Sequence, residues 1–411
     1  MNCRRSGKQR VLLAAALMFV TGVSTTSRAA EPSASSSAGL STASGLSTAS
    51  GSSTACVAPG AWVAPGRGPV TATDAIARAA RARAVLLGEN HDSAEHHRFQ
   101  LQVLSALHAQ RPGMVIALEM LPRSAQPVLD RWVAGSLSED EFVRESDWRR
   151  AWGFDFSLYA PVFHFARMNR IPMLALNIDR ALVRKVGAQG FDALTPSERG
   201  ELTRPALASA AYLDRLHQSF ASHDGKTPIA RDAPPFLRFV EAQQLWDRAM
   251  AQAIAGALSR SPDRYVVSLI GSGHVVWGDG VARQLADLGV QQVASLLPWE
   301  RDEDCRDLRA GLADAVFGLV TAPAPARFRL GVQLGDATDG VRVVSVAPGS
   351  AAAAAGVRSD DVLIEAAGVR LAKPDDLIVV IERAAGGYIL PLRVLRQGAI
   401  LDLQIPVPVQ R

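Results

Sequence analysis

The chain has no excess of basic charge once its amino terminus is set aside. Lys and Arg total 44 against 40 Asp and Glu, and residues 1–29 hold five of the basic residues and no acidic one. The remainder therefore has 39 basic residues against 40 acidic ones. Because a nucleic-acid-binding protein needs a basic surface to neutralise phosphates, this balance argues against nucleic acid as a partner.

Beyond the amino terminus, no apolar stretch is long enough for a transmembrane helix. Apolar residues make up 48% of the chain and charged residues 20%, which excludes a polytopic membrane protein and a wholly disordered one. Basic residues precede the short apolar run 11–23, and Ser27-Arg28-Ala29 then offers small residues for cleavage. We therefore predict a signal peptide over residues 1–29 and an exported mature protein, with a retained signal anchor as the alternative.

The segment after the predicted leader has the composition of a linker. Residues 30–55 are rich in Ala, Ser and Gly and contain the hexapeptide GLSTAS twice in tandem, which predicts a flexible tether. Cys56 and Cys305 are the cysteines that remain after the leader is removed. An even pair at opposite ends of one exported domain predicts a disulfide, with two separate thiols as the alternative.

Short apolar runs alternate with longer amphipathic ones in the middle of the chain. Buried strands are predicted at residues 84–87, 114–118, 171–176, 265–270 and 292–297. Helices are predicted at residues 94–109, 124–134, 158–169, 235–258 and 281–288. This alternation predicts an α/β domain over residues 56–320, a mostly parallel sheet with helices on both faces. Residues 190–235, rich in Pro, Ser and Asp, are interpreted as an insertion or lid.

Polar residues follow four of the predicted strands at the point where each strand ends. Because ligands bind at the carboxyl edge of a parallel sheet, His91, Glu119 and His274 are predicted to meet there. Two imidazoles and a carboxylate are a ligand set for zinc or another divalent metal. In the alternative interpretation, each group only caps the helix that follows it. The same loops hold Gly88, Asp92, Asn177, Asp179, Gly271 and Gly273.

Two common catalytic signatures are missing from these loops. Gly271-Ser272-Gly273 lacks both the third glycine of a dinucleotide-binding loop and the Gly-Lys-Ser/Thr of a P-loop. The nucleophile elbow G-x-S-x-G is also absent, which argues against serine hydrolase chemistry.

Five segments, in order, resemble one family. They read VLLGENHDSAEHHRFQLQVLSAL (85–107), VIALEM (115–120), PMLALNID (172–179), EAQQLWDRAMA (241–251) and LIGSGHV (269–275). Together they are similar to the ChaN-like haem-binding uptake domain of the Tiki/TraB-like superfamily, over roughly residues 75–320. The resemblance implies an α/β fold, a periplasmic or outer-membrane location and a role in haem or iron acquisition.

The resemblance to this family does not decide whether the ligand is haem or a divalent metal. For haem, the candidate axial ligands are Tyr159, Tyr212 and His223, and a cofacial haem would require a homodimer. In the Tiki branch, paired G-x-x-H motifs and a glutamate support metal-dependent proteolysis, which at the matching positions assigns the metal to His91, Glu119 and His274. Glu89 would then be the general base. A scaffold with a degenerate site is the third alternative, so the resemblance leaves it undecided whether the protein is an enzyme.

The last part of the chain resembles a different family. Beyond a linker at Pro323-Ala324-Pro325, residues 327–411 are similar to a small β-rich PDZ domain of the bacterial HtrA type, on RFRLGVQL, SVAPGSAAAAAGVRSDDVLIEAAG and the closing YILPLRVLRQGAILDLQIPV. The resemblance implies capture of a peptide or protein carboxyl terminus. A spacer domain is the alternative. The implied peptide-binding residues are Leu330, Gly331 and Val332 in the loop and Leu377 and Ile381 on the helix.

Overall fold

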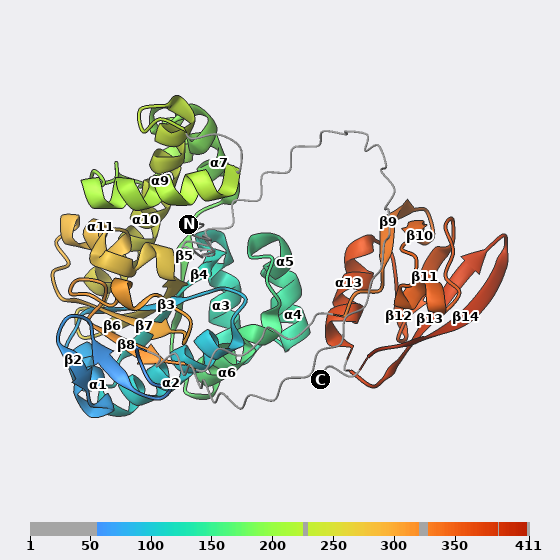
Figure 1. Ribbon diagram of the computed structural model, residues 1–411, viewed down its shortest axis with the longest axis horizontal. Coiled ribbons are helices and arrows are strands. Elements are labelled where there is room, and N and C mark those ends of the chain that lie inside the picture. The colour runs from blue at the N-terminus through green and yellow to red at the C-terminus, as the bar shows by residue number, and fades with distance from the viewer. Residues whose placement is uncertain (1–55, 225–228, 320–327, 385, 409–411) are drawn as a thin grey trace, which may run out of the picture. The chain divides into compact units, whose positions relative to one another are not determined.

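All five predicted strands form strands of one sheet (Figure 1). The structure, a computed structural model, describes residues 56–224, 229–319, 328–384 and 386–408, without the side chains of residues 222–224 and 382–383. The predicted signal peptide and tether lie outside the described residues. The chain divides into two units between Thr321 and Ala322, and each unit is treated by itself below.

The sheet of the first unit combines the predicted parallel strands with a short antiparallel edge. Its order is β2-β1-β8-β7-β3-β6-β4-β5, in which β1 pairs antiparallel with β2 and β8 and the remaining pairs are parallel. β1, β2 and β8 were not predicted, because they span only three or four residues each and β2 contains Gly and Pro. The strands are β1 (Trp62–Ala64), β2 (Gly68–Val70), β3 (Ala84–Glu89), β4 (Met114–Pro122), β5 (Met173–Asn177), β6 (Tyr265–Gly271), β7 (Val293–Trp299) and β8 (Ala315–Gly318).

Helices cover both faces of this sheet, which confirms the predicted fold class. Val85 and Leu87 of β3 pack with α1 to α6, whereas Ala84 and Leu86 pack with α7, α10 and α11 on the other face. The helices are α1 (Ala72–Ala80), α2 (Ala94–Gln110), α3 (Gln126–Val133), α4 (Glu139–Glu145), α5 (Trp148–Ala151), α6 (Ala160–Met168), α7 (Arg180–Gln189), α8 (Pro196–Arg199), α9 (Ala210–Asp224), α10 (Pro234–Arg260) and α11 (Val281–Asp287). Among the helices that the structure describes, none has the length and apolar character to cross a membrane.

The region predicted as an insertion or lid contains helices of its own. Residues 190–235 include α8 and the whole of α9. α9 packs on the first turns of α10 through a small separate core of Tyr212, Leu216, Phe236 and Val240. α9 is therefore anchored on α10, the longest helix described.

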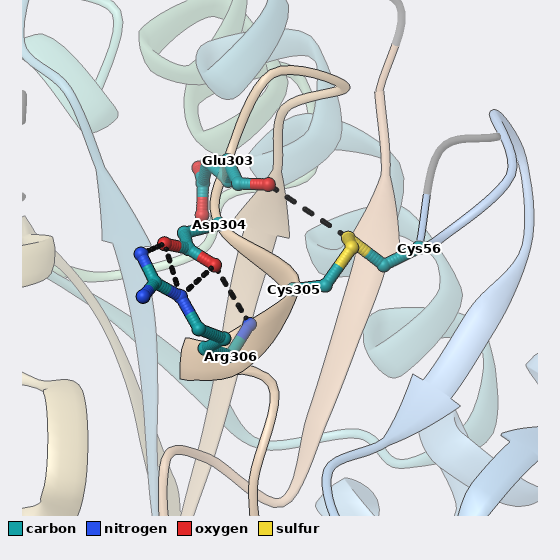
Figure 2. Close-up of a disulfide and its surroundings, with 5 residues drawn as sticks. All are labelled: Cys56, Glu303, Asp304, Cys305 and Arg306. Carbon is teal, nitrogen blue, oxygen red and sulfur yellow. Dashed lines mark hydrogen bonds and ion pairs between the residues drawn. A yellow bond between two sulfur atoms is a disulfide. The ribbon is translucent and has the colours of Figure 1, made fainter. Parts of the chain in front are cut away.

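The predicted disulfide is confirmed (Figure 2). Cys56 and Cys305 are bonded across a sequence separation of 249 residues. Cys305 begins the short 3-10 helix η6 (Cys305–Asp307), and Figure 2 shows the neighbouring Asp304 carboxylate paired with the guanidinium of Arg306. The bond ties the start of the described chain to the loop between β7 and β8.

The second unit is a separate antiparallel sheet with its own core. Its order is β14-β13-β11-β10-β9, and β12 pairs with β11. β9 is thus an edge strand, and α13 lies against it and against β12. The elements are β9 (Val332–Ala337), β10 (Gly340–Val346), α12 (Ala351–Ala354), β11 (Val362–Ala366), β12 (Val369–Arg370), α13 (Pro374–Arg383), β13 (Ile389–Arg396) and β14 (Ala399–Pro406).

Candidate functional site

A buried polar cluster lies at the carboxyl ends of β3, β6 and β4. These three strands are neighbours in the sheet, and Glu89 at the end of β3 is level with Gly271 at the end of β6. His91 and His274 follow their strands, Glu119 lies within β4 near its carboxyl end, and all three side chains are buried, at 6%, 2% and 1% exposure. Charged groups are rarely buried to this extent without partners, and each of the two histidines has one.

His91 is held by Glu89. Its Nδ1 lies 2.8 Å from Glu89 Oε1, the same oxygen accepts a hydrogen bond from the Tyr159 hydroxyl at 2.7 Å, and Gln100 Nε2 donates to Glu89 Oε2 at 2.8 Å. Burial alone would raise the pKa of Glu89, but the hydrogen bond and charge of His91 outweigh it and lower the pKa to about 2. Burial would lower the pKa of His91, and Glu89 and Glu119 together raise it.

His274 is held in the same way by Asp247 of α10. Its Nδ1 lies 2.6 Å from Asp247 Oδ1, and the Tyr212 hydroxyl of α9 donates to Asp247 Oδ2 at 2.8 Å. Burial would lower the pKa of His274, but Asp247 and Glu119 raise it to about 9. Gly280 is needed behind this pair, because a Cβ atom there would lie 2.4 Å from the His274 carbonyl oxygen and 3.0 Å from Asp247 Oδ1.

Glu119 lies between the two histidines. Its Oε2 accepts a hydrogen bond of 2.6 Å from the backbone N–H of Gly271, whereas its buried Oε1 has no hydrogen-bond partner and lies 3.6 Å from His274 Nε2. A Cβ atom on Gly271 would come within 2.8 Å of His91 Cε1 and 3.5 Å of Glu119 Oε2. Glycine at this position therefore lets His91 approach Glu119.

The structure thus gathers His91, Glu119 and His274 into one cluster, but it gathers them as ion pairs. Over residues 56–224, 229–319, 328–384 and 386–408, no group of three or more His, Cys, Asp or Glu side chains is arranged to hold a metal ion. Their role as metal ligands stays a prediction.

The placement of Glu89 does not support the predicted general-base role. Both of its carboxylate oxygens accept hydrogen bonds from protein groups, and its pKa is far below the range in which a base at neutral pH works efficiently. Glu89 instead orients the His91 ring, which packs against Trp152 and Phe154 at centroid distances of 4.5 and 5.3 Å.

Two of the three predicted haem ligands lie in the interior. Tyr159 and Tyr212 are 0% and 2% exposed, and both hydroxyl protons are donated to carboxylates. Burial and the adjacent carboxylates raise the pKa of each tyrosine well above its ordinary value. Neither phenol oxygen is therefore free to ligate iron in this structure, and the haem-ligand role of the two tyrosines stays a prediction. His223 lies in α9, but its side chain is outside the described residues.

Of the other predicted loop residues, all within the described ranges, Asn177 contacts the cluster, whereas Gly88, Asp92, Asp179 and Gly273 do not form hydrogen bonds with it. Asn177 belongs to the cluster, because its side-chain N–H donates to the backbone oxygen of Glu119 at 2.9 Å. Gly88 is a close-packing position, where a Cβ atom would lie 2.3 Å from Leu297 Cδ2. Asp179 caps α7 by accepting from Ala181 N, Asp92 is exposed, and Gly273 lies half-buried in the 3-10 helix η4 (Ser272–His274).

Sequence reasoning missed three polar residues that complete the cluster. Asp247 and Gln243 lie on one face of α10, and Gln243 Nε2 is 3.3 Å from His274 Nδ1. Gln100 lies on the buried face of α2. The available signal was a pair of polar residues four positions apart within a helix that is otherwise apolar on that face.

The predicted peptide-binding residues of the second unit lie around α13 and β9. Leu330 and Leu377 are buried in the core, whereas Gly331, Val332 and Ile381 are partly exposed. Gly331 has φ +82, and a Cβ atom there would lie 2.2 Å from Ser350 Cβ, so the loop requires glycine.

Solved structures of other proteins are similar to parts of this chain. ChaN of Campylobacter jejuni, solved with cofacial haem, is 20% identical with a TM-score of 0.48 and covers 60% of this chain and 91% of that one. The HtrA-type protease AlgW with a decapeptide is 22% identical with a TM-score of 0.19, over 21% of this chain and 30% of that one. A serine endoprotease of Yersinia pestis is 22% identical with a TM-score of 0.18, over 20% and 29%. The match therefore spans less than a third of each protease.

Two sequence families match the chain. The PDZ family matches residues 329–407, so the second unit is a PDZ domain. The family described as haem-binding uptake, Tiki superfamily, ChaN matches residues 75–285, a range that contains His91, Glu119, Asp247 and His274. No curated protein matches the chain.

Proposed function

The chain belongs to the ChaN family of haem-binding uptake proteins in the Tiki superfamily, and from that membership we propose that it is an exported haem- or iron-binding protein. The observation that carries the proposal is the family match over residues 75–285, because this range holds every side chain of the buried cluster. The PDZ domain would dock the protein on a partner.

The described tyrosines narrow the choice of haem ligand. A protein ligand must offer haem iron a free lone pair, and a tyrosine does so as a phenolate. Tyr159 and Tyr212 do not fit, because each donates its proton to a buried carboxylate. Of the three predicted ligands, His223 is the one that we retain.

A haemin titration of the chain without residues 1–29 tests this proposal. We expect a saturable, shifted Soret band in the wild type, loss of that band in His223→Ala, and an unchanged band in the matched control Tyr212→Phe. Absence of a saturable band in the wild type would reject haem binding. A normal band in His223→Ala would reject His223 as the ligand.

The second candidate function is metal-dependent hydrolysis, and one observation favours it. Each histidine of the cluster is fixed at Nδ1 by a buried carboxylate, the arrangement that orients histidine ligands in metal sites. Glu119 adds a buried oxygen without a hydrogen bond. His91, Glu119 and His274 would hold the ion, which when bound supplies an activated water.

Equilibrium dialysis with zinc, followed by elemental analysis, tests this second candidate without an activity assay. We expect about one bound equivalent in the wild type and none in His274→Ala, with His164→Ala as the control because His164 pairs with Glu139 outside the cluster. Equal metal content in all three proteins would reject the assignment.

For the PDZ domain, we propose that a partner carboxyl terminus adds to the edge strand β9 beside α13. Ile378 on α13 is 37% exposed and supplies apolar surface next to Ile381. Fluorescence polarisation with a panel of labelled carboxyl-terminal peptides tests the proposal. We expect Ile378→Asp to weaken binding about tenfold and the exposed β10 substitution Val344→Asp to leave it unchanged. If amidated peptides bind as well as free carboxylates, docking at a carboxyl terminus is rejected.

Export is tested separately. Cleavage after Ala29 predicts a mature protein that begins at Ala30 in a periplasmic or outer-membrane fraction. Intact mass measurement of the fractionated protein checks this, and a full-length mass in every fraction would contradict it.

A further inference from the structure

A cavity of about 660 Å³ opens in the first unit beside β7, α1 and α11. It borders residues 293–296 at the start of β7 and residues 310–315, which lead into β8. The cavity therefore borders the amino ends of β7 and β8, and it also reaches Trp277 and Gly278, which follow His274 in the chain. None of the residues of the histidine cluster borders it. Alanines from α1 and α11 border it, and these small side chains leave space of the size that small-molecule ligands occupy.

Three arginines give this cavity a positive charge. Arg67, Arg78 and Arg81 all border it, and within the described ranges none of their guanidinium groups forms an ion pair or a hydrogen bond. Asp314, which also borders the cavity, is already occupied: its carboxylate accepts from the backbone N–H of Ser295 at 2.8 Å and from the Ser295 hydroxyl at 3.1 Å. Free guanidinium groups bind carboxylate and phosphate oxygens in a forked geometry.

Trp277 gives the same cavity an aromatic face. Its backbone has φ +64, a conformation that is unfavourable for a bulky residue, and its N–H is held by the Leu312 carbonyl oxygen at 2.9 Å. The guanidinium carbons of Arg309 and Arg215 lie 4.9 and 5.8 Å from the centroid of the indole ring. Planar rings stack on indole faces and beside guanidinium groups.

We propose that this cavity binds a small anion that carries a planar ring, the chemistry of a nucleoside monophosphate. The ring stacks on Trp277, and the oxyanion binds the guanidinium groups of Arg67 and Arg78, with Arg81 adding a further positive charge. This site is separate from the haem or metal site proposed above and does not depend on it.

Calorimetric titration of the chain without residues 1–29 tests the proposal with three probes. Adenosine monophosphate carries both the ring and the charge, ribose 5-phosphate lacks the ring, and adenosine lacks the charge. We expect saturable binding of adenosine monophosphate that weakens as salt is added, and at least about tenfold weaker binding of the other two probes.

A double variant localises the binding. Arg67→Ala/Arg78→Ala is expected to bind adenosine monophosphate at least about tenfold more weakly and to melt at the wild-type temperature, because both residues are exposed. Arg170→Ala removes an exposed guanidinium before β5, at the far end of the sheet, and serves as the control. The proposal is overturned if adenosine monophosphate does not saturate, if the double variant binds it as the wild type does, or if ribose 5-phosphate binds equally well.

Discussion

His91 and His274 have the same kinds of hydrogen-bonding partner, but these partners lie at different separations along the sequence. Each imidazole bonds through Nδ1 to a buried carboxylate, and each carboxylate accepts a tyrosine hydroxyl. Around His91, the carboxylate is two residues away, in the strand that the histidine follows. Around His274, it is 27 residues away on α10, and the tyrosine comes from α9. The carboxylate that holds His91 is therefore positioned by the end of a strand, whereas the carboxylate and tyrosine around His274 are positioned by the packing of two helices.

The largest expected effect comes from removing one carboxylate at a time. Asp247→Ala removes the hydrogen-bonded counter-charge of His274 and leaves only Glu119, 3.6 Å away, which should lower the free energy of unfolding by about 3–5 kcal/mol. Glu89→Ala should do the same for His91. Urea denaturation measures the loss. Histidine NMR titration should show that Asp247→Ala lowers the pKa of His274 much more than that of His91, and that Glu89→Ala does the reverse.

The control for this comparison is a conservative substitution. Asp247→Asn keeps the shape and a hydrogen-bond acceptor, so it should cost less than Asp247→Ala while still lowering the pKa of His274. If either alanine variant shifts both histidines by the same amount, the two arrangements act as one unit and the comparison fails.

This difference in construction also explains what the sequence could predict. Strand ends followed by His91, Glu119 and His274 were visible as short apolar runs that stop at a polar group, and the parallel sheet brings such ends together. The burial of Tyr212 was not visible, because its position depends on how α9 packs on α10. Gln243 and Asp247 marked a buried polar position on α10, but no local pattern reports which loop that face of the helix meets.

The same reasoning accounts for the burial of Tyr212, one of the predicted haem ligands. Tyr212 lies in a segment rich in Pro, Ser and Asp, whose composition predicts exposure. The structure buries it because α9 is amphipathic and rests on Phe236 and Val240. The composition of this segment therefore did not indicate the burial of the one tyrosine within it.

The next largest effect is on how the free energy of unfolding depends on pH, and it has opposite signs for the His274–Asp247 and His91–Glu89 pairs. The pKa of His274 is raised to about 9. The stability that its charged form contributes is therefore fully present below pH 6.5 and is lost as the pH rises through about 9. The pKa of Glu89 is lowered from 4.5 to about 2. The stability that its ionised form contributes is therefore fully present above pH 4.5 and is lost as the pH falls through about 2. Each loss should be on the order of 3 kcal/mol.

Unfolding free energies measured from about pH 1.5 to pH 10 check this prediction. Asp247→Asn should flatten the alkaline limb and leave the acid limb unchanged. An alkaline limb that is as steep in this variant as in the wild type would show that another group causes the loss.

Removing the tyrosine hydroxyls should have a smaller effect that again separates the two arrangements. Tyr159→Phe and Tyr212→Phe each delete one hydrogen bond to a buried carboxylate, and each should lower the free energy of unfolding by about 1.5–3 kcal/mol. The Tyr159 variant leaves Glu89 with Gln100 as a second donor, so it should be the milder of the two. Chemical denaturation of both variants measures the order, and a milder Tyr212 variant would contradict it.

The smallest expected effect marks where the cluster ends. Asp179 was predicted as a site-loop residue, but its carboxylate caps α7 by accepting from the backbone N–H of Ala181 at 2.7 Å. Asp179→Ala should therefore lower the free energy of unfolding by about 1 kcal/mol, the usual cost of losing an N-terminal cap. Asp179→Asn should restore most of it, because asparagine caps helices as well as aspartate does. Neither variant should change the pKa of His91 or His274, and a shift of either histidine in an NMR titration would place Asp179 inside the cluster after all.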